Sequence, residues 1–290
     1  MKNNKSIKRA LNEYAKSVKG ELIDNSHFYD FRQNIFPEDM NERFKKMFLA
    51  GDGNELISKA CAVNSSSMLG FNFFHWISKN ATITINSITY DEVLFEVKIP
   101  VLKGTKPANM DIVLKNNSND YLFIESKFLE YTKTTSFEIS KTYKQKLDRY
   151  YCLGEKWAEF ISNYDSHKKK QYWAGIKQEI CHLIGLTNWL SRETSIGNNK
   201  RYSNSGNIQF INLVFEPKES FTSEHKKFSS YKQLYEELYK QLKSNNLIPD
   251  KLQINFKTYS DLWPYIISSN LPNGLKDYLY EHYMKFAEVE

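Results

Sequence analysis

The most constraining feature of the sequence is a pair of apolar runs separated by a short polar tract, MDIVLKNNSNDYLFIESKF at 110–128. The tract 115–120 (KNNSND) is rich in residues that favour turns. The run 121–124 is continuously apolar, which is typical of a central strand covered on both faces. The pattern therefore predicts a β-hairpin that lies inside a sheet.

Charged residues enter this hairpin while the strands continue. Asp111 lies in the first run, and Glu125 and Lys127 follow the apolar stretch of the second. Residues two apart on a strand point to the same face, so Glu125 and Lys127 point together. Asp111 joins them only if it pairs with Glu125. That register requires a three-residue loop (117–119), a five-residue loop (116–120) or a bulge near Asp111.

The rest of the chain alternates helical and strand patterns. This order predicts a mixed α/β fold, with a central sheet flanked by helices. No boundary is clean enough to split the chain, so we expect a single domain. Helices are expected at about 1–20, 38–50, 54–79 (with an interruption near 65–67), 137–164, 172–190, 231–242 and 260–268, and further strands at 81–85, 93–99, 208–215 and 252–256.

Composition excludes several classes of protein. A chain of 290 residues can bury a core without disulfides or metals. No apolar run approaches the roughly 18 residues that a membrane-spanning helix needs, and no signal peptide is visible. Three widely spaced cysteines fit a reduced, cytoplasmic protein. The net charge of +6 permits a polyanionic partner without demanding one.

Two carboxylates and a lysine at one end of a sheet suggest a specific chemistry. Carboxylates hold Mg²⁺, which prefers oxygen ligands and keeps several of its waters. The bound ion polarises a phosphate and lowers the pKa of a bound water. A lysine beside it can orient that water or stabilise charge that develops on the phosphate.

Asp111 followed by Glu125-Ser126-Lys127 resembles the D…(E/D)XK signature of the PD-(D/E)XK nucleases. This superfamily contains restriction endonucleases and many repair and defence nucleases. The family's proline directly before the aspartate is displaced here, because Pro107 lies four positions before Asp111. The resemblance implies a restriction-endonuclease-like αβββαβ core at about 54–216. Residues 1–53 would then form a helical N-terminal extension and 217–290 a C-terminal extension.

The resemblance also implies a function. It implies Mg²⁺-dependent hydrolysis of phosphodiester bonds, with Mn²⁺ substituting and with in-line attack that leaves a 5′-phosphate. Asp111 and Glu125 would hold the metal, and Lys127 would position the water. Some members add an acid from the first helix, for which Glu55 is the candidate. Others add a glutamine on the helix after the E-X-K strand, and Gln178 matches it.

DNA is the expected substrate, RNA stays open, and a homodimer is compatible with the sequence. His182 lies one turn after Gln178 on the same helical face, but we interpret it as a packed or surface histidine. Basic tracts can follow a nucleic-acid backbone, although solvated helix faces explain them equally well. These tracts are Lys141, Lys144, Lys146 and Arg149, then 168–170, then 200–201.

Two other functions remain open from the sequence. One is a nucleic-acid-binding or assembly module that keeps the fold without cleavage, and the other is a metal-dependent phosphatase. The six histidines and three cysteines show no zinc-finger spacing, and neither a G-x-S-x-G nor a complete phosphate-binding loop occurs. A role in restriction or phage defence is an expectation by analogy alone.

Overall fold

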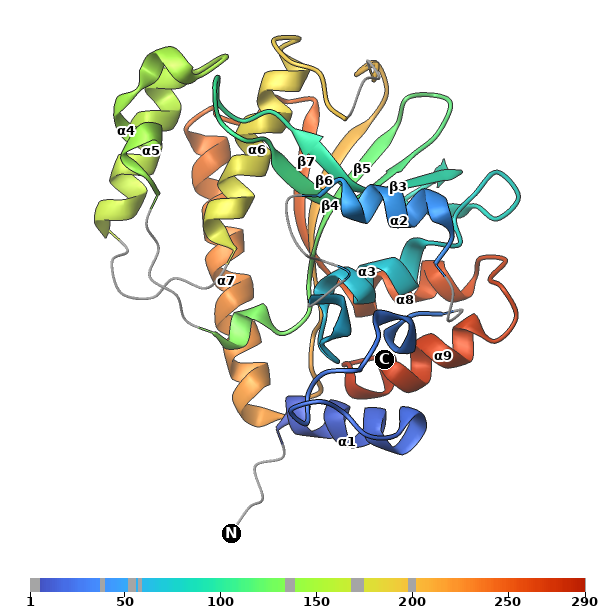
Figure 1. Cartoon of the computed structure of the whole chain (residues 1–290). Helices are drawn as coiled ribbons and strands as arrows, with labels where there is room; N and C mark the ends of the chain where they lie inside the picture. The colour runs from blue at the N-terminus through green and yellow to red at the C-terminus, as the bar shows by residue number, and fades with distance from the viewer. Residues whose placement is uncertain are drawn as a thin grey trace.

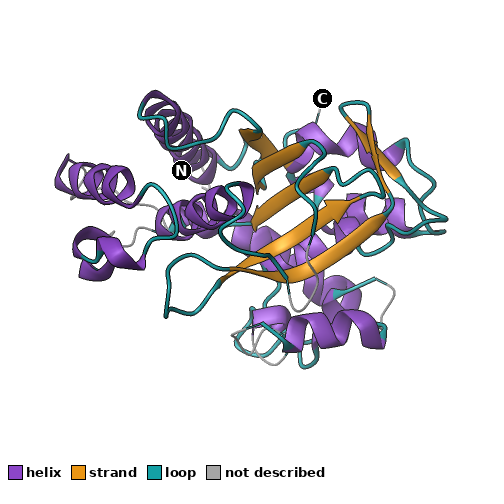
Figure 2. Cartoon of the chain, turned by 90° about the horizontal axis from the view of Figure 1, so that it is seen from above, coloured by secondary structure: helices purple, strands orange, loops and turns teal. Residues whose placement is uncertain are grey.

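The computed structural model describes residues 6–36, 40–51, 56, 59–133, 139–167, 175–197 and 202–289. Its centre is a mixed sheet in the order β3-β4-β5-β6-β7, seen from above in Figure 2. β3, β4 and β5 pair antiparallel, whereas β5, β6 and β7 run parallel. A separate hairpin joins β1 to β2. The strands are β1 (Ile83–Ile85), β2 (Ile88–Tyr90), β3 (Glu92–Ile99), β4 (Ala108–Lys115), β5 (Tyr121–Lys127), β6 (Ile208–Val214) and β7 (Leu252–Thr258).

The β4–β5 hairpin has the register that the site requires. Lys115 pairs with Tyr121 and Ile112 pairs with Ile124, so the loop is the five-residue alternative, 116–120. The Asn116 side chain organises this loop, because its Oδ1 accepts the backbone N–H groups of both Ser118 and Asp120. Continued by one residue, the same register sets Asp111 opposite Glu125. The prediction that these two carboxylates share a face is confirmed.

Two helices cover one face of the sheet (Figure 1). α6 (Ile176–Leu190) connects β5 to β6 and packs on β3 and β4, and α7 (Thr222–Ser244) connects β6 to β7 and packs on β7. Successive right-handed crossovers in one direction place their helices on the same face, as here. A Cβ at Gly185 would lie 2.4 Å from Ile99 Cγ2, so glycine permits the close approach of α6 to β3. Outside these helices lie α4 (Lys141–Gln145) and α5 (Gly154–His167).

The opposite face is covered from both ends of the chain. α2 (Glu42–Leu49) packs on β3, α3 (Ser66–Phe74) packs on β4 and β5, and α8 (Tyr259–Ile267) packs on β7. α1 (Ile7–Lys19) lies against α9 (Leu275–His282) in the outer layer, as Figure 1 shows. Aromatic side chains pack in this layer. Rings from α2, α3 and β3 form edge-to-face and stacked pairs there. The rings are those of Phe44, Phe48, Phe71 and Phe95.

The elements α3, β3, β4, β5, α6 and β6 supply the αβββαβ core that the resemblance implied, with the β1–β2 hairpin inserted after α3 and with α4 and α5 inserted before α6. The fold is therefore mixed α/β and restriction-endonuclease-like, as predicted. The division into a core and two extensions stays a prediction. No helix within the described ranges is long and apolar enough to cross a membrane.

Several predicted element bounds were wrong. Of the helix expected over 54–79, the described residues form a short 3-10 helix at Lys59–Cys61 and then α3, because the Ser65 side chain accepts the Met68 backbone N–H and starts a new helix there. The helix expected over 137–164 is split into α4 and α5, with a 3-10 helix at Leu147–Arg149 and Leu153, at φ 50°, between them. α7 is longer than the expected 231–242. The sequence analysis also missed β2 and α9.

Candidate active site

The carboxyl end of β5 carries the predicted charged pair. Glu125 is 0 % exposed and Lys127 is 7 % exposed, and the Lys127 ammonium donates to Glu125 Oε1. Asp111, on the neighbouring strand, is half-buried, and its Oδ2 accepts the Ser126 backbone N–H at 2.8 Å. The structure thus brings Asp111, Glu125 and Lys127 together at one place on the sheet.

Helix α6 adds two side chains from the adjacent layer. Gln178 Oε1 accepts from Lys127 Nζ at 3.1 Å, which places this predicted residue at the site. His182 Nδ1 lies 3.3 Å from Glu125 Oε2. Gly175 begins the helix at φ 114°, and a Cβ there would lie 3.3 Å from Lys127 Cε. Glycine therefore allows α6 to begin directly against the lysine stem.

Burial and mutual charge set the protonation of this cluster. Burial, reinforced by the Glu125 charge, raises the pKa of Asp111 to about 7. Burial also raises the pKa of Glu125, while Lys127 acts in the opposite direction. Burial alone would lower the pKa of Lys127, but the neighbouring carboxylates outweigh it and raise that pKa. Desolvation lowers the pKa of His182 to about 4. The lysine is thus charged and the imidazole neutral at pH 7.

The cluster borders a cleft of about 550 Å³ between β4 and α6. Asp111, Gln178 and His182 line it, whereas Glu125 and Lys127 lie behind them in the protein interior. A cleft that is lined by Asp111 and has the ion pair buried behind it can admit a ligand to Asp111 while keeping bulk water away from Lys127. Basic side chains stand at its edge: Lys59, Lys106 and Lys177.

The sequence analysis did not identify Glu96 as a site residue. Glu96 lies on β3 between Phe95 and Val97, which pair with the β4 residues on either side of Asp111. Its φ of 52° is unusual inside a strand, and its side chain lines the same cleft. An acid within the apolar run EVLFEVKI is the same kind of interruption that marked Asp111, so the signal was present.

A buried polar layer supports the site from behind. Glu179, next to Gln178 on α6, is 0 % exposed, and its Oε1 accepts the hydroxyl of Tyr239. Burial raises the pKa of Glu179 to about 8, although the tyrosine hydrogen bond opposes this. Tyr239 belongs to a stripe along α7 with Tyr231 and Tyr235, whose ring centroids are 4.5 Å apart. The four-residue spacing of these tyrosines predicts that they share one face of a helix. It does not predict that this face lies behind Lys127.

Two observations bear on a metal. Glu125 Oε2 is buried without a hydrogen-bond partner, which leaves an acceptor available. Among the residues that the structure describes, no group of three or more His, Cys, Asp or Glu side chains forms a ready metal site. Mg²⁺ commonly uses only one or two carboxylates and fills its other positions with water, so Asp111 and Glu125 fit its needs. Glu55 lies outside the described residues.

Gln178→Ala tests the contact between α6 and the lysine. We expect the rate of the reaction at this site to fall roughly tenfold, because a hydrogen bond to a charged group contributes about 1.5 kcal/mol and this one holds the lysine in place. Metal affinity should stay unchanged, since Gln178 contacts the ammonium and neither carboxylate. Steady-state cleavage and calorimetric metal titration measure the two effects. An equal loss of metal binding would instead place Gln178 among the metal ligands.

No curated protein and no solved structure matches the chain. One family model, described as restriction endonuclease associating with ARP, matches residues 2–284. That match covers nearly the whole chain and agrees with the fold and with the D…EXK hairpin. The chain therefore belongs to this restriction-endonuclease family.

Proposed function

We propose that this protein is a divalent-metal-dependent nuclease that hydrolyses phosphodiester bonds in DNA. The observation that carries the proposal is the convergence of Asp111, Glu125 and Lys127 at one place on the sheet, where Asp111 lines a cleft. Membership of a restriction-endonuclease family supports a nuclease role. The same membership favours DNA over RNA and favours a role in restriction or phage defence.

Asp111 and Glu125 would hold the metal. When bound, the ion supplies charge to the scissile phosphate and acidity to a water molecule. Asp111 lines the cleft, so its carboxylate can contact a ligand that binds there. Glu125 brings a second, buried carboxylate whose Oε2 has no hydrogen-bond partner. This pair supplies the hard oxygen ligands that Mg²⁺ and Mn²⁺ accept.

Lys127 supplies the permanent positive charge of the site. Its ammonium is held between Glu125 Oε1 and Gln178 Oε1, so two of its three N–H groups have fixed partners. The third can donate to the attacking water or to a phosphate oxygen as negative charge develops there. Because Lys127 is buried, its charge acts with little screening by solvent.

A cleavage assay distinguishes the candidate functions. Supercoiled plasmid and short duplexes are incubated with the full-length protein in Mg²⁺, in Mn²⁺ and in EDTA. We expect cleavage with either metal and none in EDTA, with 5′-phosphate ends. Nucleic-acid binding without cleavage would favour the inactive binding module. Hydrolysis of a phosphate monoester without DNA cleavage would favour the phosphatase.

The basic residues beside the cleft provide a test of DNA binding. Tyr143 of α4 lines the cleft, and the exposed Lys141 and Lys146 lie on either side of it in sequence. We expect the double variant Lys141→Glu and Lys146→Glu to bind DNA more weakly. The slope of log affinity against log salt should fall in magnitude by roughly 2, since each lost phosphate contact releases about one counterion fewer.

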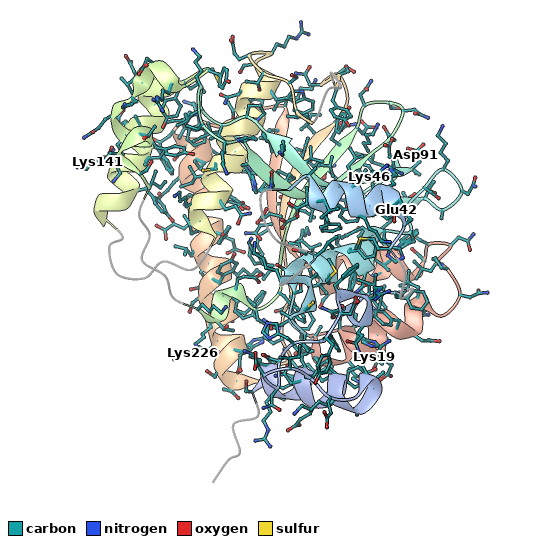
Figure 3. The ribbon with its side chains drawn as sticks, viewed as in Figure 1. Lys19, Glu42, Lys46, Asp91, Lys141 and Lys226 are labelled. Atoms are coloured by element: carbon teal, nitrogen blue, oxygen red, sulfur yellow. The ribbon has the colours of Figure 1, made fainter. Side chains whose placement is uncertain are left out.

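The matched control reverses two exposed lysines elsewhere, Lys226 on α7 and Lys276 on α9. Figure 3 shows Lys141 at the upper left and Lys226 lower on the same side of the view, toward the lower end of α7. Both double variants change the net charge by the same amount, so a difference between their salt slopes reports a local contact with DNA. Equal salt slopes for the two would assign Lys141 and Lys146 to solvated surface. Residues 168–170 and 200–201, the other basic tracts, lie outside the described residues.

A further inference from the structure

His182 has an unusual set of neighbours for a buried histidine. Its side chain is 0 % exposed, and its Nε2 lies 3.0 Å from the backbone carbonyl oxygen of Asn109. A carbonyl oxygen only accepts hydrogen bonds, so Nε2 must carry the proton. In the neutral imidazole, Nδ1 then presents a lone pair. The backbone of β4 therefore fixes which nitrogen of His182 is free to bind a cation.

That lone pair lies next to a second one. Nδ1 is 3.3 Å from Glu125 Oε2, and both atoms are buried without a hydrogen-bond partner. Two electron-rich atoms this close repel each other, and leaving both unsatisfied in the interior is costly. Protonating Nδ1 would remove this repulsion only if Nδ1 then donated a hydrogen bond to Glu125 Oε2. The geometry of the two atoms forms no such bond. A metal ion satisfies both atoms at once.

The separation suits two neighbouring ligands of one ion. Nitrogen and oxygen donors bind first-row ions at about 2.0–2.2 Å, which places adjacent donors roughly 3 Å apart. The other ring nitrogen of His182 also has the partner expected of a metal ligand, because metal-bound histidines usually donate their other N–H to a carbonyl or carboxylate. Here that acceptor is the Asn109 carbonyl oxygen.

We propose that His182 Nδ1 is a ligand of the active-site metal together with Glu125 Oε2, and that this nitrogen donor makes the site select Mn²⁺ or Co²⁺ over Mg²⁺. The inference rests on the proposed function and adds a metal preference to it. Imidazole nitrogen suits first-row transition ions, whereas Mg²⁺ demands oxygen.

The nitrogen ligand has a direct spectroscopic signature. Full-length protein is loaded with Mn²⁺ at substoichiometric level, and its electron spin echo is recorded. We expect modulation from a directly coordinated ¹⁴N in the wild type and none in His182→Gln. Calorimetric titration should show Mn²⁺ binding weakened by at least about tenfold in the variant. The affinity for Mg²⁺ should change much less, so the preference for Mn²⁺ shrinks.

His75→Gln is the matched control. His75 is also a mostly buried histidine with a ring nitrogen on a backbone carbonyl, but it stacks on Phe71 across the sheet from the site. It should retain the ¹⁴N signal and both affinities. Metal-free thermal melts establish that each variant is folded, and the wild-type spectrum tests the ligand without any variant.

Bound Mn²⁺ without a ¹⁴N signal in the wild type would overturn the inference and leave the proposed nuclease intact. An unchanged Mn²⁺ to Mg²⁺ preference in a folded His182→Gln protein would do the same. Failure of the wild type to bind any divalent ion would instead defeat the proposed function itself.

Discussion

Asp111→Asn is expected to abolish cleavage and, at the same time, to stabilise the metal-free protein. Asparagine keeps an acceptor for the Ser126 backbone N–H, so the strand pairing survives. It removes a negative charge from the metal site, and a bound metal lowers the reaction barrier by several kcal/mol. We therefore expect cleavage to fall about a thousandfold or more, equivalent to about 4 kcal/mol. Affinity for Mn²⁺ should fall by at least about tenfold.

The gain in stability has a defined pH dependence. The pKa of Asp111 rises from 3.8 to about 7 on folding, so between these values the folded state holds a proton that the unfolded state has lost. The contribution of Asp111 to the free energy of unfolding is therefore complete below pH 4 and declines as the pH rises through 7. An asparagine side chain at this position cannot ionise, so the variant does not suffer this decline.

Wild type and Asp111→Asn should unfold at similar denaturant concentrations near pH 4. At pH 8 the variant should be more stable by about 1–2 kcal/mol, which is less than the full shift implies because the carboxylate is partly exposed. Chemical denaturation in EDTA across this range measures the difference. A variant that is less stable at pH 8 would show that Asp111 is structural. Cleavage at the wild-type rate would remove it from the site.

The hairpin site was predictable because its signals are local. Asp111, Glu125 and Lys127 interrupt apolar strands, and the two-residue period of a strand fixes which of them share a face. The two-residue period is compatible with a loop of three residues or of five. The Asn116 side chain, which accepts two backbone N–H groups of the loop, favours five residues over three.

The contribution of α6 could not be predicted in the same way. His182 has the sequence context of an ordinary helical residue, and its position depends on where α6 lies against β4. That placement is tertiary, and it follows partly from Gly185, which permits close packing on Ile99. The break between α4 and α5 was equally hidden, because Leu153 adopts a positive φ that its type disfavours. Local propensity carries no information about either.

Lys127→Met should separate two roles of the lysine. One is its role in catalysis, and the other is its stabilisation of the metal-free fold. Glu125 is fully buried, and the Lys127 ammonium is its direct partner. Removing one member of a buried ion pair leaves an uncompensated charge, at a cost of about 3–5 kcal/mol. The loss should be smaller at low pH, because protonated Glu125 needs no partner. Stability of the variant in EDTA should therefore decline as the pH rises above 4.5, the unperturbed pKa of this carboxyl group.

Divalent metal should restore most of this stability, because the ion replaces the ammonium beside Glu125. At a hundred times its Kd, a ligand that binds only the folded state adds about 2.7 kcal/mol. Mn²⁺ should also bind Lys127→Met more tightly than the wild type, since the lysine no longer competes for the carboxylate. Cleavage should nevertheless remain absent at saturating metal, because the water and the transition state have lost their cation.

The double variant Glu125→Gln with Lys127→Met is the control for the ion pair. It removes both charges, so its metal-free stability should exceed that of Lys127→Met, and added Mn²⁺ should stabilise it little. Thermal melts in EDTA and in Mn²⁺ compare the stabilities of the wild type and the two variants. Plasmid cleavage is measured in parallel. If Lys127→Met were as stable as the wild type in EDTA and indifferent to metal, Glu125 would not depend on Lys127. If it cleaved DNA normally, the lysine would have no part in catalysis, and the acid pair alone would have to account for the chemistry.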